Sequence, residues 1–196
     1  PMEHTLDYEK LSVMDKWILS KLNSTIQTCD SSLENYKIPE TAKALQEFVD
    51  DLSNWYVRRS RERYWAKGME QDKVNAYMTL YTCLTEIAKA AAPMIPFMTE
   101  EIYQNIVVKV DPSAPESIHL CDYPKANEAH VDKELEADMD LVLKVVVLGR
   151  ACRNSGNMKN RQPLANMFVK APFTLNEFFK DIIADELNIK TVTFTD

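Results

Sequence analysis

The sequence predicts a mainly α-helical protein in two parts: a helical bundle over residues 1–126, and a small α/β subdomain over residues 127–196 made of one helix and a β-α-β unit. Three observations predict this fold class. Apolar side chains recur every three or four residues through the first part, which is typical of amphipathic helices. Only 3 glycines occur in 196 residues, too few for an architecture rich in β-hairpins. After Pro124, short stretches of β-forming residues, some of them alternating, indicate strands.

Three long helices are expected in the first part. The first covers about residues 11–29, where apolar side chains keep a helical period. The second covers about residues 39–65, with Pro39 near its first turn, where proline is well tolerated, and Gly68 after its end. The third covers about residues 72–92. Two prolines stop it, because proline lacks a backbone donor and clashes with a continuing turn.

A short helix and a connector complete the first part. Thr99 is expected to be the N-cap of a fourth helix, with Glu100 and Glu101 in the first turn. The stretch KVDPSAPESIHLCDYPK, residues 109–125, is rich in proline and connects the two parts, with SIHLCDY expected to be extended. Long antiparallel helices joined by short links form an α-helical bundle.

The second part changes character. A long helix is expected over about residues 132–155, then a strand over 165–171, a helix over 174–187 and a strand over 189–196. These last three elements form a β-α-β unit. Because two strands alone are marginally stable, we expect the helix over 132–155 to pack on them.

Composition excludes membrane proteins and secreted proteins. The chain has 45% hydrophobic and 27% charged residues, as an ordinary soluble protein does, and we expect it in the cytoplasm. No apolar run approaches the roughly 20 residues of a membrane span. The polar N-terminus has no secretory pattern, and its start at Pro1 suggests a piece of a longer chain.

Motifs for catalysis and metal binding are absent from the sequence. The 4 cysteines and 3 histidines are scattered, without the close pairs that zinc sites use. No glycine-rich phosphate loop and no nucleophile motif occurs. We therefore predict no catalytic residue, no metal site and no cofactor for these 196 residues.

Charge is distributed unevenly along the chain. The formal net charge is -7, yet residues 58–67 hold 5 basic residues and 1 acidic one, and residues 141–170 hold 6 basic residues and none that is acidic. Two basic islands in an acidic chain are typical of a protein that binds a polyanion locally and repels it elsewhere.

The first basic island, NWYVRRSRERYW, divides by helical phase. Rotation by about 100° per residue places Arg59 and Arg63 on the apolar side of the helix, where a guanidinium needs a partner. Arg58, Arg61 and Trp65 fall on the opposite side, and this set is suited to phosphate contact and base stacking. We predict these three as RNA-binding residues.

The second basic island supplies further candidates for RNA binding. Arg150 and Arg153 are three residues apart and share a helix face. Lys159 and Arg161 lie in the loop that follows, with Gln162 available for hydrogen bonds. The alternative for both islands is ordinary surface ion pairs, each worth about 0–1 kcal/mol.

Several segments together resemble the isoleucyl-tRNA synthetase family. WYVRRSRERYW resembles its anticodon-binding helix, and the similarity extends over nearly the whole chain through LSVMDKWILSKLN, AAPMIPFMTEEIYQNI, SIHLCDYP, VVVLGRACRNSGNMKNRQPL and DELNIKTVTF. Within this set APMIPFMTEEIY is weakly specific, because valyl and leucyl enzymes carry similar sequences. The arginine segment and SIHLCDYP are more specific to the isoleucyl enzymes.

The resemblance implies an anticodon-binding helical bundle followed by a small mixed subdomain. It implies binding of the tRNA(Ile) anticodon stem-loop, and contact with a catalytic domain elsewhere in a longer chain. ATP and Mg²⁺ would serve that full-length enzyme. The family's adenylate-forming motifs HIGH and KMSKS do not occur in these 196 residues, so this part is expected to be non-catalytic.

Two alternatives stay open from the sequence. One alternative is the corresponding region of a valyl- or leucyl-tRNA synthetase, which keeps the enzyme class and changes the amino acid and the tRNA. A helical-bundle module whose basic islands meet an acidic protein is an alternative of another class.

Overall fold

The computed structural model describes residues 4–195. Its contacts divide the chain into two compact units, of which the first ends at Asp132 and the second begins at Lys133. The boundary between residues 126 and 127 stays a prediction about domains. None of the helices within residues 4–195 combines the length and apolar character that a membrane span requires.

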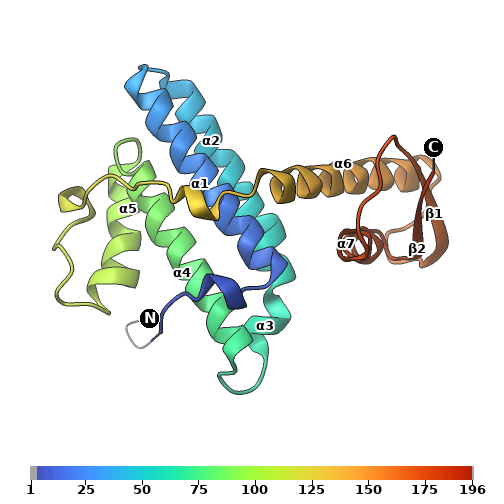
Figure 1. The fold of residues 1–196 in the computed structure, drawn as a ribbon, viewed down its shortest axis with the longest axis horizontal. Helices are drawn as coiled ribbons and strands as arrows, with labels where there is room; N and C mark the ends of the chain where they lie inside the picture. Colours follow the sequence, from blue (N-terminus) through green and yellow to red (C-terminus); the bar gives the residue numbers. More distant parts are fainter. Residues whose placement is uncertain (1–3, 196) are drawn as a thin grey trace. The chain divides into compact units, whose positions relative to one another are not determined.

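The first unit is a helical bundle, which confirms the mainly α fold class (Figure 1). Short 3₁₀ turns also occur between its longer helices. Its elements, in chain order, are η1 (Tyr8–Lys10), α1 (Val13–Glu34), α2 (Ile38–Asp50), the π-helix η2 (Asp51–Val57), α3 (Arg61–Trp65), α4 (Gln71–Ala91), α5 (Pro96–Tyr103), the π-helix η3 (Gln104–Val108), η4 (Ile118–Leu120) and η5 (Glu128–His130).

Helix α1 is central to the bundle, since it packs on α2, on η2 and on α4. Its start is fixed by a capping box: the Asp15 amide donates to Ser12 Oγ, and the Ser12 amide donates to the Asp15 carboxylate. Trp17 and Ile18 are fully buried on it, together with Phe48 of α2 and Tyr56 of η2.

The segment predicted as one helix over residues 39–65 is interrupted. The backbone widens into a π-helix over Asp51–Val57 and breaks its helical run at Ser60, which lies in a turn. A π turn takes more residues than an α turn, so the phase of the residues that follow is shifted. The prediction of a continuous helix is therefore wrong at its C-terminal end.

Helix α5 begins at Pro96, three residues before the predicted N-cap. Proline fits the first turn of a helix because its missing N–H has no partner there. Thr99 lies inside the helix, and its hydroxyl donates to the carbonyls of Ile95 and Pro96. The prediction of Thr99 as N-cap is wrong, since threonine also forms this local bond within a helix.

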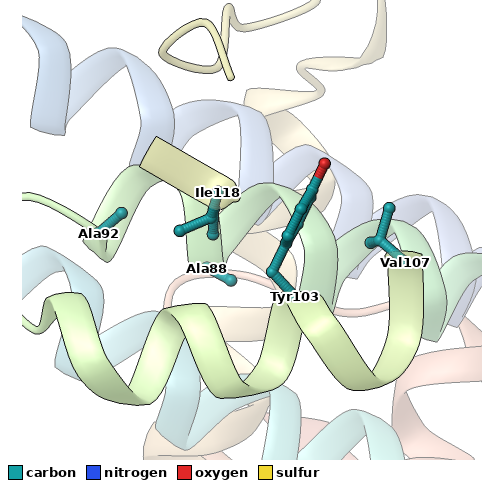
Figure 2. Packing of buried hydrophobic residues seen from close by; sticks show 5 residues of the cluster. All are labelled: Ala88, Ala92, Tyr103, Val107 and Ile118. Carbon is teal, nitrogen blue, oxygen red and sulfur yellow. The ribbon is translucent and has the colours of Figure 1, made fainter. Parts of the chain in front are cut away.

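The connector after η3 is held against the bundle by a small apolar cluster. Figure 2 shows its five buried members, which come from α4 and the turn after it, from α5, from η3 and from the connector: Ala88, Ala92, Tyr103, Val107 and Ile118. The Tyr103 hydroxyl donates to the Pro115 carbonyl over 3.1 Å. SIHLCDY, expected to be extended, instead contains the 3₁₀ turn η4, which brings Ile118 into the cluster.

The second unit consists of α6 (Lys133–Ser155), β1 (Leu164–Lys170), α7 (Glu177–Leu187) and β2 (Ile189–Thr195). β1 and β2 are parallel, and their register runs from Leu164 opposite Ile189 to Lys170 opposite Thr195 (Figure 1). The predicted β-α-β unit is therefore confirmed.

Helix α6 packs on α7, and α7 packs on β2. At Gly149 the two helices approach so closely that an added Cβ would collide with the Leu187 side chain. Residues of α6 and β1 together line a pocket of about 330 Å³. Direct packing of α6 on the strands stays a prediction.

Candidate nucleic-acid interface

Arg63 is the structural member of the first basic island. Its Nη1 donates to Asp15 Oδ1 and its Nη2 to Asp15 Oδ2, both over 2.8 Å. Its Nε and Nη2 also reach the carboxylate of Asp72 at the start of α4, over 2.9 and 2.8 Å. The Tyr56 hydroxyl donates to Asp15 Oδ1 over 2.6 Å. This network ties α3 to both α1 and α4.

The hydrogen bonds of this network favour the ionised form of the Asp15 carboxyl group. Burial alone raises the pKa of Asp15, but hydrogen bonds from Arg63, Tyr56 and Ser12 outweigh burial and bring the pKa below its ordinary value. Burial, followed by the Asp15 charge, raises the pKa of the Tyr56 hydroxyl well above its ordinary value, so it stays a donor. The Asp15 carboxylate is fully buried, and its charge is matched by the guanidinium.

The three predicted RNA-binding residues of this island are exposed, and we call Arg58, Arg61 and Trp65 the outer set. Arg58 Nε donates to the Asn54 carbonyl over 2.7 Å, and its guanidinium lies 5.6 Å from the Trp55 ring centre. Arg61 is exposed, and 78% of Trp65 is exposed. Such a large exposed aromatic beside arginines can stack on a base while the arginines hold phosphates.

Arg59 and Arg63 are both partly buried, on the side that helical phase predicted. This partial burial distinguishes them from the outer set, whose side chains are exposed. The Arg63 side chain is 18% exposed and fully engaged with two carboxylates. We therefore assign Arg63 the role of holding α3 in place, so that Arg61 and Trp65 of the same short helix are presented in a fixed orientation.

The second basic island is built around α6 and the loop that follows it. Arg150 Nη2 lies 2.7 Å from Glu186 Oε2 of α7, and the Arg150 side chain is 42% exposed. Part of this guanidinium is therefore used to neutralise a carboxylate that is only 3% exposed. Arg150 thus links the two helices and still reaches the surface.

Arg153, predicted to share a helix face with Arg150, is only 2% exposed. Its Nη2 donates to the Lys159 carbonyl over 2.5 Å and to the Gln162 carbonyl. Its Nε and Nη1 are buried and have no hydrogen-bond partner within the described residues. Arg153 therefore holds the loop against α6, and its role as an RNA-binding residue stays a prediction.

Lys159, Arg161 and Gln162 are exposed in this loop. The loop is held from a second side, because Asn188 Nδ2 donates to the Asn160 and Arg161 carbonyls over 3.4 and 3.0 Å. Two cations and one amide are therefore displayed on a backbone that is fixed at both of its flanks, an arrangement suited to phosphate contacts.

Sequence reasoning missed Asp15, the residue on which Arg63 depends. One signal was available, since Asp15 lies four residues after Leu11 and three before Ile18, on the apolar side of a helix. A carboxylate on an apolar face needs a buried partner. Nothing local indicates that the partner is 48 residues away.

Metal binding finds no support in the side chains of residues 4–195, where no group of three His, Cys, Asp or Glu residues is arranged to hold an ion. The thiols are free: Cys29 and Cys83 are buried, Cys121 is half-buried and Cys152 is exposed.

Comparison with known proteins relates the chain to tRNA ligases. The family model described as the anticodon-binding domain of tRNA ligase matches residues 15–168. The chain is 55% identical over 194 residues to an isoleucine–tRNA ligase of Clostridium novyi, and 52% identical over 194 residues to one of Clostridium tetani. These alignments cover 99% of the chain and 18% of each relative.

A relative with lower sequence identity is also an isoleucine–tRNA ligase. The chain is 44% identical over 189 residues to the isoleucine–tRNA ligase of Thermus thermophilus, covering 94% of the chain. The chain spans only 18% of the length of that relative as well.

Proposed function

The chain belongs to the family of anticodon-binding domains of tRNA ligases, and from this premise we propose that it binds the anticodon stem-loop of tRNA(Ile) within a cytoplasmic isoleucine–tRNA ligase. The observation that carries the proposal is the outer set. Arg58, Arg61 and Trp65 are exposed beside a network that fixes Arg63 with two carboxylates. A segment held in place that presents two guanidinium groups and an indole at the surface is suited to RNA recognition.

The proposed mechanism uses shape, charge and stacking. In the first unit, the outer set contacts the RNA: the arginines bind phosphates and Trp65 stacks on a base. In the second unit, Arg150, Lys159, Arg161 and Gln162 add phosphate and base contacts. Arg153 supports these loop contacts, because its hydrogen bonds hold the backbone of Lys159 and Gln162 in place.

The acidic background of the chain favours cooperation with a second tRNA contact. A formal net charge of -7 repels RNA outside the basic islands and keeps the affinity of the anticodon contact modest. We propose that the catalytic domain of the longer enzyme holds the acceptor end, so that the two linked contacts reinforce each other. In this proposal the chemistry with ATP and Mg²⁺ belongs to that domain.

Binding to three purified tRNAs tests the proposal. A fluorescence titration at low salt should show tighter binding of tRNA(Ile) than of tRNA(Val) or tRNA(Leu). Preference for one of the other two would favour the corresponding region of a valyl or leucyl enzyme. Absence of RNA binding, together with a stable complex with an acidic protein, would favour a protein-interaction module.

A further inference from the structure

The pocket between α6 and β1 is the feature of the second unit that the proposed function leaves unused. Its volume of about 330 Å³ lies near the lower end of the range of about 300–1,000 Å³ for small-molecule sites. Residues of α6, of the loop after it and of β1 contribute to its wall, among them Leu148, Cys152, Arg153, Met158, Phe168 and Lys170.

Arg153 contributes polar N–H groups to the wall of this pocket, and some of them find no hydrogen-bond acceptor among the described residues. Nη2 uses its hydrogens on the carbonyls of Lys159 and Gln162, while Nε and Nη1 have no partner among residues 4–195. A buried guanidinium with unpaired N–H groups is costly, because it has lost water without gaining an acceptor. A ligand that brings acceptors to the pocket wall would offset this cost.

The wall also carries large apolar side chains that solvent reaches. Phe168 on β1 is 70% exposed, and Leu148 on α6 is 65% exposed. Apolar faces of this kind are unsuited to a hydrated phosphate and suited to a flat group with an apolar face and a polar edge. A nucleobase has that shape, and an aromatic side chain such as Phe168 is the usual partner for stacking.

The charge around the pocket favours a nucleic acid. No acidic residue occurs between Leu141 and Lys170, and Lys170 itself contributes to the wall. An unpaired base in the pocket leaves its sugar and phosphate outside, where lysine and arginine side chains of this basic island can meet the phosphate.

We propose that the pocket between α6 and β1 binds one unpaired nucleobase of the tRNA, stacked on Phe168 and hydrogen-bonded through its edge to Arg153. This inference rests on the proposed function. Nε and Nη1 are buried, so the base reaches them as a side chain of the wall moves aside. Met158 is suited to that movement, because its unbranched thioether has three rotatable bonds.

Cys152 offers a direct test of occupancy, since it lies in the pocket wall and is the exposed thiol, whereas Cys29 and Cys83 are buried. The rate of its alkylation by N-ethylmaleimide is measured with and without saturating tRNA(Ile) transcript. Bound tRNA should slow labelling at least about tenfold, and removal of one particular loop base, leaving an abasic nucleotide, should restore the rate. An unchanged rate with tRNA bound, or protection that survives removal of every loop base in turn, overturns the inference.

A substitution in the pocket wall gives a second readout. Phe168→Ala should weaken tRNA binding about 5- to 100-fold, as loss of one base stack does, and Phe168→Trp should restore binding. Because Phe168 is largely exposed, the variant should fold. Phe178→Ala is the matched control, since Phe178 is 37% exposed on α7 and is not among the pocket-lining residues. Equal affinities of the Phe168→Ala and Phe178→Ala variants overturn the inference.

Failure of the inference and failure of the proposed function are distinguishable. Normal tRNA(Ile) affinity with an unprotected Cys152 removes the base pocket and leaves the proposed function intact. If the thiol is already protected without RNA in the full-length enzyme, protein fills the pocket and the inference is overturned. Absence of tRNA binding under any salt condition overturns both.

Discussion

The guanidinium of Arg63 holds the carboxylate of Asp15 at two points, with Nη1 2.8 Å from Oδ1 and Nη2 2.8 Å from Oδ2. The two residues are 48 positions apart, and the Asp15 side chain is fully buried. This ion pair joins the start of α1 to the short helix α3. It accounts for the division of the first basic island into a structural residue and the outer set.

Replacement of Arg63 should destabilise the first unit. Arg63→Ala leaves the Asp15 carboxylate buried without its cation, and the free energy of unfolding should fall by about 3 kcal/mol. Urea denaturation followed by tryptophan fluorescence measures this unit alone, because all 3 tryptophans, Trp17, Trp55 and Trp65, lie in it. The control Arg61→Ala should change stability by less than about 0.5 kcal/mol. Equal stability of the two variants would contradict the structural role of Arg63.

Acid should weaken the same ion pair. The pKa of Asp15 in the folded state lies below its ordinary value of 3.8, so the folded state binds fewer protons than the unfolded state in this range. The contribution of Asp15 is therefore complete above the ordinary value and is lost as the pH falls through the lower folded pKa. Asp15→Asn should be less stable at pH 7 and should lose less stability on acidification below about pH 4 than the parent does. An acid-induced loss equal to that of the parent would rule this contribution out.

Salt should separate the two kinds of contact within the outer set. If Arg61 neutralises one phosphate, Arg61→Ala should reduce the slope of log affinity against log salt concentration by about 0.7–1. Trp65→Ala removes stacking and no charge, so affinity should fall by about 1–3 kcal/mol with the slope unchanged. Titrations of the anticodon stem-loop at several salt concentrations measure both quantities. Identical slopes for the parent and Arg61→Ala would remove Arg61 from the interface.

Gly149 should be required for the packing of α6 on α7. An added methyl group collides with Leu187, and overpacking of this kind costs about 1–3 kcal/mol. Gly149→Ala should therefore speed hydrogen exchange of the amides in Glu177–Leu187, while Lys144→Ala, an exposed change on the same helix, should not. Unchanged exchange in Gly149→Ala would show that α7 can shift without cost.

Much of the fold could be predicted because its determinants are local. Helix α4, Gln71–Ala91, lies within one residue of its predicted range at each end, since its apolar period and the prolines after it are visible in sequence. The β-α-β unit was predictable from strand-like stretches flanking a helical one. The π-helix over Asp51–Val57 was not, because this widening interrupts the apolar period without a proline or glycine to mark it.

The candidate site was predictable in part. The family resemblance is confirmed by the match over residues 15–168 and by the isoleucine–tRNA ligase relatives. Helical phase predicted an outward set and a partly buried Arg63, but the partner Asp15 depends on tertiary contact. The burial of Arg153 depends on the carbonyls of Lys159 and Gln162, whose positions follow from the fold of the loop. The RNA contacts themselves stay predictions.

The most direct test of the account is the affinity of the tRNA(Ile) anticodon stem-loop for the parent and for an Arg58→Ala/Arg61→Ala variant. The control Lys37→Ala/Lys43→Ala removes the same net charge from exposed positions at and near the start of α2. We predict binding at low salt, a loss of at least about tenfold in the arginine variant and a much smaller loss in the lysine variant. Absence of binding at low salt, or equal losses in the two variants, would contradict the claim that the outer set recognises the anticodon arm.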